Sequence, residues 1–117
     1  MAYVDGFVVA VPNANKNIYI QYAKEAAAIF KEYGAIKVIE CWGDDVPEGE
    51  VTSFPMAVKR QPDETVVFSW ITWPSKSSRN EGMKKAMADS RLSPDAHPMP
   101  FDGRRMIYGG FETVVDD

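Results

Sequence analysis

The segment that follows Asn13 and Asn15 is the clearest helix in the sequence, and it lies between two strand-like segments. Its apolar residues recur every three or four positions, and Gly34 supplies the left-handed residue that commonly ends a helix. Tyr3–Val11 before it and Ile36–Gly43 after it are rich in apolar and β-branched residues, as strands are. A strand, a helix and a second strand in this order favour a two-layer α+β fold.

A second strand–helix–strand unit follows the first. Thr52–Lys59 is predicted to be a short edge strand, and Thr65–Trp73, which is dense in β-branched and aromatic residues, a central one. The second helix begins near Ser75, or later if Ser78 caps it, and Arg104–Val114 forms the last strand. The sequence therefore predicts a single ferredoxin-like βαββαβ domain over residues 1–117, with an antiparallel sheet and both helices on one face.

Composition excludes several classes of protein. The 117 residues carry a net charge of −4 without a long basic run, which argues against nucleic acid as a partner. No apolar stretch approaches the ~20 residues that span a bilayer, so no membrane association is expected. One cysteine and one histidine cannot form a disulfide framework or a zinc site, and no phosphate loop, dinucleotide fingerprint or haem motif occurs. We therefore expect a cytoplasmic protein with no cofactor.

Alternation along the strands predicts two unlike faces for the sheet. Small and aliphatic residues are expected to face the helices: Val4, Val8, Ala10, Ile39, Cys41, Val67, Ser69, Ile71, Ile107, Gly109 and Phe111. The other parity mixes aromatic and charged residues: Tyr3, Asp5, Phe7, Val38, Glu40, Trp42, Phe68, Trp70, Arg104, Met106, Tyr108 and Glu112. A partly wet cavity closed by a second subunit would suit both the aromatics and the acids. A β-bulge at Gly109–Gly110 would reverse the side on which Glu112 lies, so the sequence does not determine the face of Glu112.

The predicted cavity supplies the candidate site. Its expected ligand-binding residues are Tyr3, Asp5, Glu40, Trp42, Trp70 and Tyr108. Glu40 and Asp5 are candidate acid–base groups, because burial among like charges raises a carboxyl pKa, although pairing with arginine would make them structural instead. His97 is a weak candidate proton shuttle, since a solvated loop histidine is the more common case. Cys41 is expected to be a small buried hydrophobe.

Several motifs carry a resemblance to a known family. YVDGFVVAVP, VIECWGDDVPEGE, SFPMAVK, VVFSWITWPSK and MPFDGRRMIYGGFE together cover nearly the whole chain. With them the chain resembles the YbaA-like proteins, a bacterial family of unknown function. The family is similar in fold to the dimeric α/β-barrel superfamily, in which two ferredoxin-like subunits close their sheets into one barrel. That superfamily includes small monooxygenases, isomerases, haem-binding proteins and stress proteins, so the resemblance implies a shape and no particular reaction.

Two hypotheses for the function follow. In the first, a homodimeric α/β barrel binds a small, partly apolar molecule in its lumen, with cofactor-free acid–base or monooxygenase-like chemistry. In the alternative, the barrel is packed shut and the protein is a non-catalytic interaction or stress-related domain. The presence or absence of a cavity that can hold a ligand distinguishes them.

Overall fold

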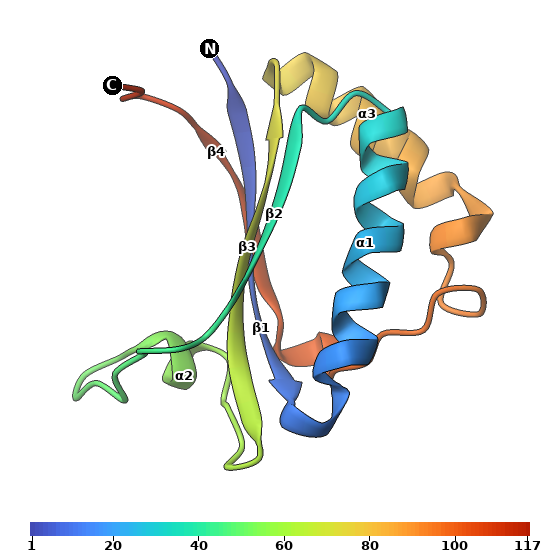
Figure 1. The fold of residues 1–117 in the computed structure, drawn as a ribbon. Coiled ribbons are helices and arrows are strands. Elements are labelled where there is room, and N and C mark those ends of the chain that lie inside the picture. The colour runs from blue at the N-terminus through green and yellow to red at the C-terminus, as the bar shows by residue number, and fades with distance from the viewer.

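The computed structural model describes residues 1–117 and is built on a four-stranded antiparallel sheet (Figure 1). Its strands are β1 (Tyr3–Pro12), β2 (Lys37–Trp42), β3 (Glu64–Trp73) and β4 (Ile107–Glu112). They lie in the order β2-β3-β1-β4, so the two ten-residue strands are central and the two shorter strands form the edges. The predicted α+β class and the antiparallel sheet are confirmed.

Two helices, α1 (Lys16–Glu32) and α3 (Lys76–Ala88), cover one face of this sheet (Figure 1). Gly34 has the predicted left-handed conformation, with φ of 108°, and follows the last turn of α1. The hydroxyl of Ser75 accepts the N–H of Ser78 at 3.1 Å and thereby caps α3. The helix start at Ser75 is therefore confirmed, and the later start at Ser78 is wrong. Neither helix is long and apolar enough to cross a membrane.

Two predicted strands differ from the structure. Thr52–Lys59 contains the short helix α2 (Phe54–Ala57) and no strand, because the Ser53 hydroxyl caps the N–H of Met56 at 3.1 Å and Pro55 suits a first turn. The last strand is shorter than predicted and begins only at Ile107, after a 3₁₀ turn at Gly103–Arg105. Its pairing with β1 runs without a bulge through the two glycines of the strand.

The largest correction concerns the faces of the sheet. Residues paired directly across two strands share a face, and the register pairs Val8 with Phe68, Ile39 with Trp70 and Val4 with Phe111. The predicted parity is right for β3, whose Val67 and Ile71 pack under the helices, and wrong for β1, β2 and β4. The face under the helices carries Tyr3, Asp5, Phe7, Val9, Val11, Val38, Glu40, Trp42, Ser69, Trp73, Tyr108 and Glu112 with the two β3 residues.

The error has a physical cause in the run Val8–Val11. The segment around α2 folds onto the far side of the sheet, where Val58 forms a buried cluster with Val8, Ala10 and Val66. Both parities of β1 are therefore buried at this end, and the apolar–polar alternation that reveals an inner face is lost.

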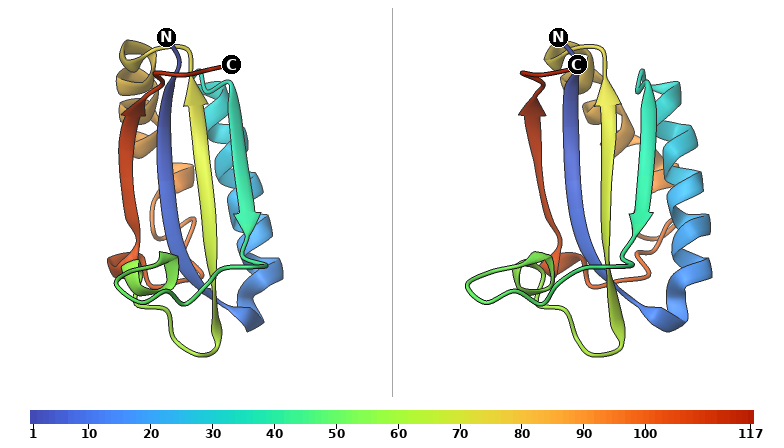
Figure 2. Two further views of the ribbon diagram at one scale, coloured as in Figure 1. Left: turned by 90° about the vertical axis from the view of Figure 1, so that its left-hand side faces the viewer. Right: turned by 60° about the vertical axis from the view of Figure 1, so that its left-hand side comes forward.

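Beyond that segment, the face away from the helices lacks any covering element. Figure 2 shows the four strands from this side, with the α2 segment across one end and the C-terminal residues that follow β4 across the other. Phe68 and Phe111 are 44% and 63% exposed there, and Phe54 of α2 lies against Phe68 with ring centroids 5.8 Å apart. Phe68 in turn contacts Trp70 at 5.4 Å. We call this surface the open face; between the strand ends its side chains are apolar or small, and Cys41 is among them.

Candidate functional site

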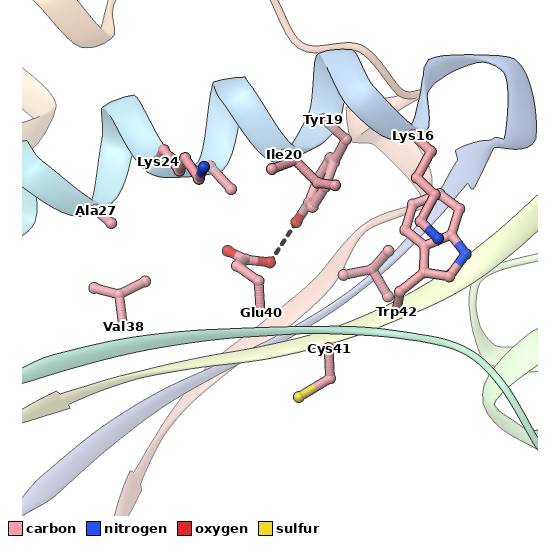
Figure 3. Close-up of a pocket in the computed structure, with 11 residues that line it drawn as sticks. Lys16, Tyr19, Ile20, Lys24, Ala27, Val38, Glu40, Cys41 and Trp42 are labelled. Atoms are coloured by element: carbon pink, nitrogen blue, oxygen red, sulfur yellow. Dashed lines mark hydrogen bonds between the residues drawn. The ribbon is translucent and has the colours of Figure 1, made fainter.

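A cleft of about 290 Å³ separates α1 from the edge strand β2 (Figure 3). One stripe of the helix forms its roof, and its floor is formed by Val67 of β3 and by β2, of which the Cys41 side chain points away from the helix (Figure 3). Its lining consists of Lys16, Tyr19, Ile20, Ala23, Lys24, Ala27, Val38, Glu40, Cys41, Trp42 and Val67.

Small residues of α1 leave this space open. Ala23 and Ala27 occupy successive turns of the stripe that faces β2, because residues four apart lie on one side of a helix. A larger side chain at Ala27 would fill the gap between the helix and Val38 (Figure 3). The alanine-rich middle of α1 is thus the sequence feature that produces the cleft.

Glu40 lies at the centre of the cleft floor and points toward α1 (Figure 3). The Tyr19 hydroxyl donates to Oε1 of Glu40 at 2.6 Å, while the second carboxylate oxygen is turned away from Tyr19. Partial removal from water raises the pKa of Glu40 above its ordinary value, and the Tyr19 and neighbouring Ser69 hydroxyls oppose that rise. A carboxylate with a raised pKa and an oxygen that is turned away from its tyrosine partner can accept a hydrogen bond, or a proton, from a bound molecule.

Tyr19 itself remains a phenol at physiological pH. Burial is the main cause that raises its pKa far above 10, and the negative charge of Glu40 adds to it. The Tyr19 hydroxyl donates its hydrogen to Glu40, so the pair presents hydrogen-bond acceptors to the cleft. The sequence analysis did not pair Tyr19 with Glu40, because the predicted parity put Glu40 on the face of the sheet away from the helices.

Two ammonium groups flank the carboxylate. Lys16 lies over the Trp42 ring, 5.1 Å from its centroid, at one end of the cleft. Lys24 is one turn beyond Ile20 and forms no ion pair. The rim therefore carries two positive charges around one central negative charge.

The structure separates the remaining predicted site residues. Asp5 is 3% exposed and accepts hydrogen bonds from Arg79 at 2.7 and 3.1 Å and from the Trp73 indole at 3.0 Å. The guanidinium of Arg79 lies 5.2 Å from the Tyr3 ring centroid. This network ties α3 to β1, and Asp5 faces the helices, not the open face. The arginine partner lies on α3, and the sequence analysis did not predict this pairing.

Tyr108 and Trp70 also lie outside the cleft. Tyr108 stacks on Phe7 at 6.4 Å and is largely exposed on β4, whereas Trp70 is on the open face. Glu112 pairs with Tyr3 at the far end of β4 and is exposed. The six predicted ligand-binding residues therefore do not surround one cavity, and only Glu40 and Trp42 share the cleft.

His97 and Cys41 both differ from expectation. His97 is 7% exposed, stacks on Tyr22 with centroids 3.9 Å apart, and donates from Nε2 to the Tyr22 carbonyl at 2.9 Å. His97 connects the loop that follows the 3₁₀ turn Ser90–Leu92 to α1, and it is not a solvated loop residue. Cys41 is exposed on the open face and is not a buried hydrophobe, because its parity is the reverse of that predicted.

The motif around Arg104 and Arg105 is structural. Asp102 caps the turn by accepting the Arg104 N–H at 3.0 Å. Arg105 turns inward, where it forms two hydrogen bonds of 2.8 and 2.7 Å with the buried Glu64. No group of three or more metal-ligating side chains occurs in the structure.

Comparison with known proteins places these features in a family context. A family model described as protein of unknown function (DUF1428) matches residues 2–103. The chain is 55% identical to the uncharacterized protein YbaA of Escherichia coli K12 over 117 residues, which is the full length of both proteins. The uncharacterized protein YbaA of Shigella flexneri matches at the same identity and coverage. These relatives carry no described activity.

Proposed function

The chain belongs to the family of proteins of unknown function called DUF1428, and on that premise we propose that it is a homodimer that binds a small, partly apolar molecule in the cleft of each subunit. The Tyr19–Glu40 pair in an otherwise apolar cleft is the observation that supports binding. The open face is the observation that supports the dimer. The single cysteine suits a reducing compartment, so the proposal includes the cytoplasm.

The proposed dimer is a ferredoxin-like α/β barrel in which two open faces meet. Two ten-residue and two six-residue strands, at ~3.4 Å per residue and ~4.8 Å spacing, give a face of roughly 520 Å². A standard interface buries about 800 Å² on each partner, so the face has the required order of size. Monomers rarely expose an apolar patch of more than a few hundred Å². Since the acids lie under the helices, the two faces would pack against each other as an apolar interior, which favours a closed barrel over a wet lumen.

The dimer is tested by light scattering on the purified protein at micromolar concentration. Phe68→Glu places a charge in the centre of the open face and should give a monomer. Ile18→Glu is the matched control, because Ile18 is an exposed apolar residue of α1 outside the cleft, and it should leave the dimer intact. A wild-type monomer, or a dimer that survives Phe68→Glu, would contradict the barrel.

The cleft suits a small ligand in both volume and lining. Ligand pockets usually measure about 300–1,000 Å³ and combine apolar walls with a few polar groups, so this cleft corresponds to a molecule of modest size. Val38, Ala27 and the Trp42 ring offer apolar contact, and Glu40 offers a directed acceptor. Placement of Glu40 in the cleft also moves the predicted acid–base chemistry from the barrel interior to the helix side of the sheet.

A cleft-filling variant tests binding. Ala27→Leu should abolish ligand-induced thermal stabilisation in a screen of small molecules, whereas Ala28→Leu, at an exposed position on the same helix, should not. Glu40→Gln should weaken the ligands that donate a hydrogen bond and leave purely apolar ones unaffected. Equal ligand responses in the wild-type protein and Ala27→Leu would exclude the cleft as the binding site.

A further inference from the structure

The charges around the cleft restrict what it can bind. This inference rests on the proposed function and concerns the chemical class of the ligand. Glu40 accepts but does not donate when ionised, and its Oε1 is already engaged by Tyr19. A ligand that uses Glu40 must therefore bring a hydrogen-bond donor to the second oxygen. A hydroxyl group satisfies this need without adding charge.

The lysines determine the other end of the ligand. Lys16 has its ammonium on the Trp42 ring, but Lys24 has neither an ion-pair partner nor an aromatic one. With two ammonium groups against one carboxylate, the lining has a net charge of +1 when all three groups are ionised. An anionic group near Lys24 would complement it, and a cationic one would be repelled by both lysines.

The helix sets the spacing between the two ends. Tyr19, beside Glu40, and Lys24 are five residues apart on α1, which corresponds to about 7.5 Å along the axis. Between them the cleft is lined by Ile20 and Ala23, which are apolar. The length and lining match a short apolar body with a hydroxyl at one end and an anion at the other.

We propose that the cleft binds a small hydroxylated organic acid, with its hydroxyl donated to Glu40, its apolar body beneath Ile20 and Ala23, and its carboxylate beside Lys24. The Trp42 ring closes one end of the cleft, and Ala27 with Val38 lines the other. Figure 3 shows Lys24 on the same side of Glu40 as Ala27 and Val38, opposite the Lys16–Trp42 end.

Four related probes test each part of this assignment. 4-Hydroxyphenylacetate has the hydroxyl and the carboxylate, 4-methylphenylacetate lacks the donor, 4-hydroxyphenylacetamide lacks the charge, and tyramine reverses it. Dissociation constants at pH 7.5 come from ¹H–¹⁵N NMR titration of the full-length protein, followed at the amides of Glu40 and Trp42. 4-Hydroxyphenylacetate should bind most tightly, about three- to fivefold better than the acetamide, as expected for one partly exposed ion pair.

Variants assign the charge to its residue. Lys24→Gln should remove the preference for the acid over the acetamide, and Lys31→Gln, on the same helix outside the cleft, should preserve it. Tyramine binding as tightly as the acid, or an unchanged preference in Lys24→Gln, would overturn the ligand class while leaving the cleft a binding site. Absence of any shift at Glu40 and Trp42 with all four probes at millimolar concentration would overturn the proposed binding function as well.

Discussion

Gly82 in the middle of α3 gives the sharpest test of the packing, because local propensity and tertiary contact predict opposite signs. On propensity alone, glycine in a helix interior is about 1 kcal/mol less favourable than alanine, so Gly82→Ala should stabilise the protein. In the structure, however, a Cβ at this position would lie 2.4 Å from Cζ3 of Trp73 and 2.5 Å from the Tyr33 carbonyl oxygen. Normal contacts are about 3.5–4.0 Å between carbon atoms.

Neither obstacle can move easily. Trp73 is completely buried and its indole N–H is hydrogen-bonded to Asp5. The Tyr33 oxygen belongs to the backbone at the end of α1. Overpacking in a tight core costs typically 1–3 kcal/mol, and this site belongs at the upper end of that range. After subtraction of the helix preference, Gly82→Ala should lower the free energy of unfolding by about 2 kcal/mol.

Urea denaturation followed by far-UV circular dichroism, at one protein concentration for all variants, measures this difference. Lys84→Ala compared with Lys84→Gly supplies the control, because Lys84 is exposed in the same helix and should report only the propensity of about 1 kcal/mol. In a Trp73→Phe background the cost of Gly82→Ala should fall but not vanish, since the Tyr33 oxygen remains. A Gly82→Ala protein as stable as wild type would refute the close approach of α3 to the sheet.

The buried and partly buried charges give three more expectations, all measured as urea midpoints. Arg79→Met should cost about 3–5 kcal/mol at pH 7, since it leaves the Asp5 carboxylate buried without its counter-charge, and a loss below 1 kcal/mol would contradict that pairing. Hydrogen bonding to Arg105 holds the pKa of Glu64 below its ordinary value, so this pair stabilises the fold above roughly pH 4.3 and the stabilisation is lost as pH falls further. Glu64→Gln should therefore flatten the decline in stability below that pH, and an unchanged acid profile would be evidence against it. Burial raises the pKa of Glu40, so its ionised form is less favourable in the folded protein than in the unfolded chain. Glu40→Gln should therefore keep or slightly raise the free energy of unfolding at pH 7. A clear decrease would make Glu40 a structural residue.

The order of helices and strands was largely predictable from the sequence. Alternation, β-branched residues and the glycine after α1 located the helices and three of the strands to within a few residues, because these signals are local. The segment around α2 was mistaken for a strand, since its apolar residues indicated burial but not conformation. There the Ser53 cap ahead of Pro55 was the signal that distinguishes a helical turn from an edge strand.

The faces of the sheet could not be predicted from each strand alone. In β2, each parity carries one charged residue, Lys37 on one and Glu40 on the other, among apolar ones, so the pattern permits either orientation. Only the register with β3 resolves it, because Glu40 lies opposite Ser69 and Cys41 lies opposite Phe68. Once β3 was oriented correctly by Val67 and Ile71, the pairing would have oriented β1 and β2 as well. Register depends on contacts between strands that are distant in sequence, and the pattern of a single strand does not reveal it.

Reversal of the faces separates the two roles that the sequence had assigned to one cavity. An apolar surface free of acids suits self-association, because no charge needs a partner when the surface is buried. The carboxylates on the opposite side divide by their surroundings. Asp5 has a guanidinium and an indole as partners and holds α3 against β1, whereas Glu40 has the Tyr19 and Ser69 hydroxyls beside it and faces an open cleft. Of the two acids, Glu40 therefore retains hydrogen-bonding capacity for a ligand, and the alanines of α1 leave the space in which that ligand would reach it.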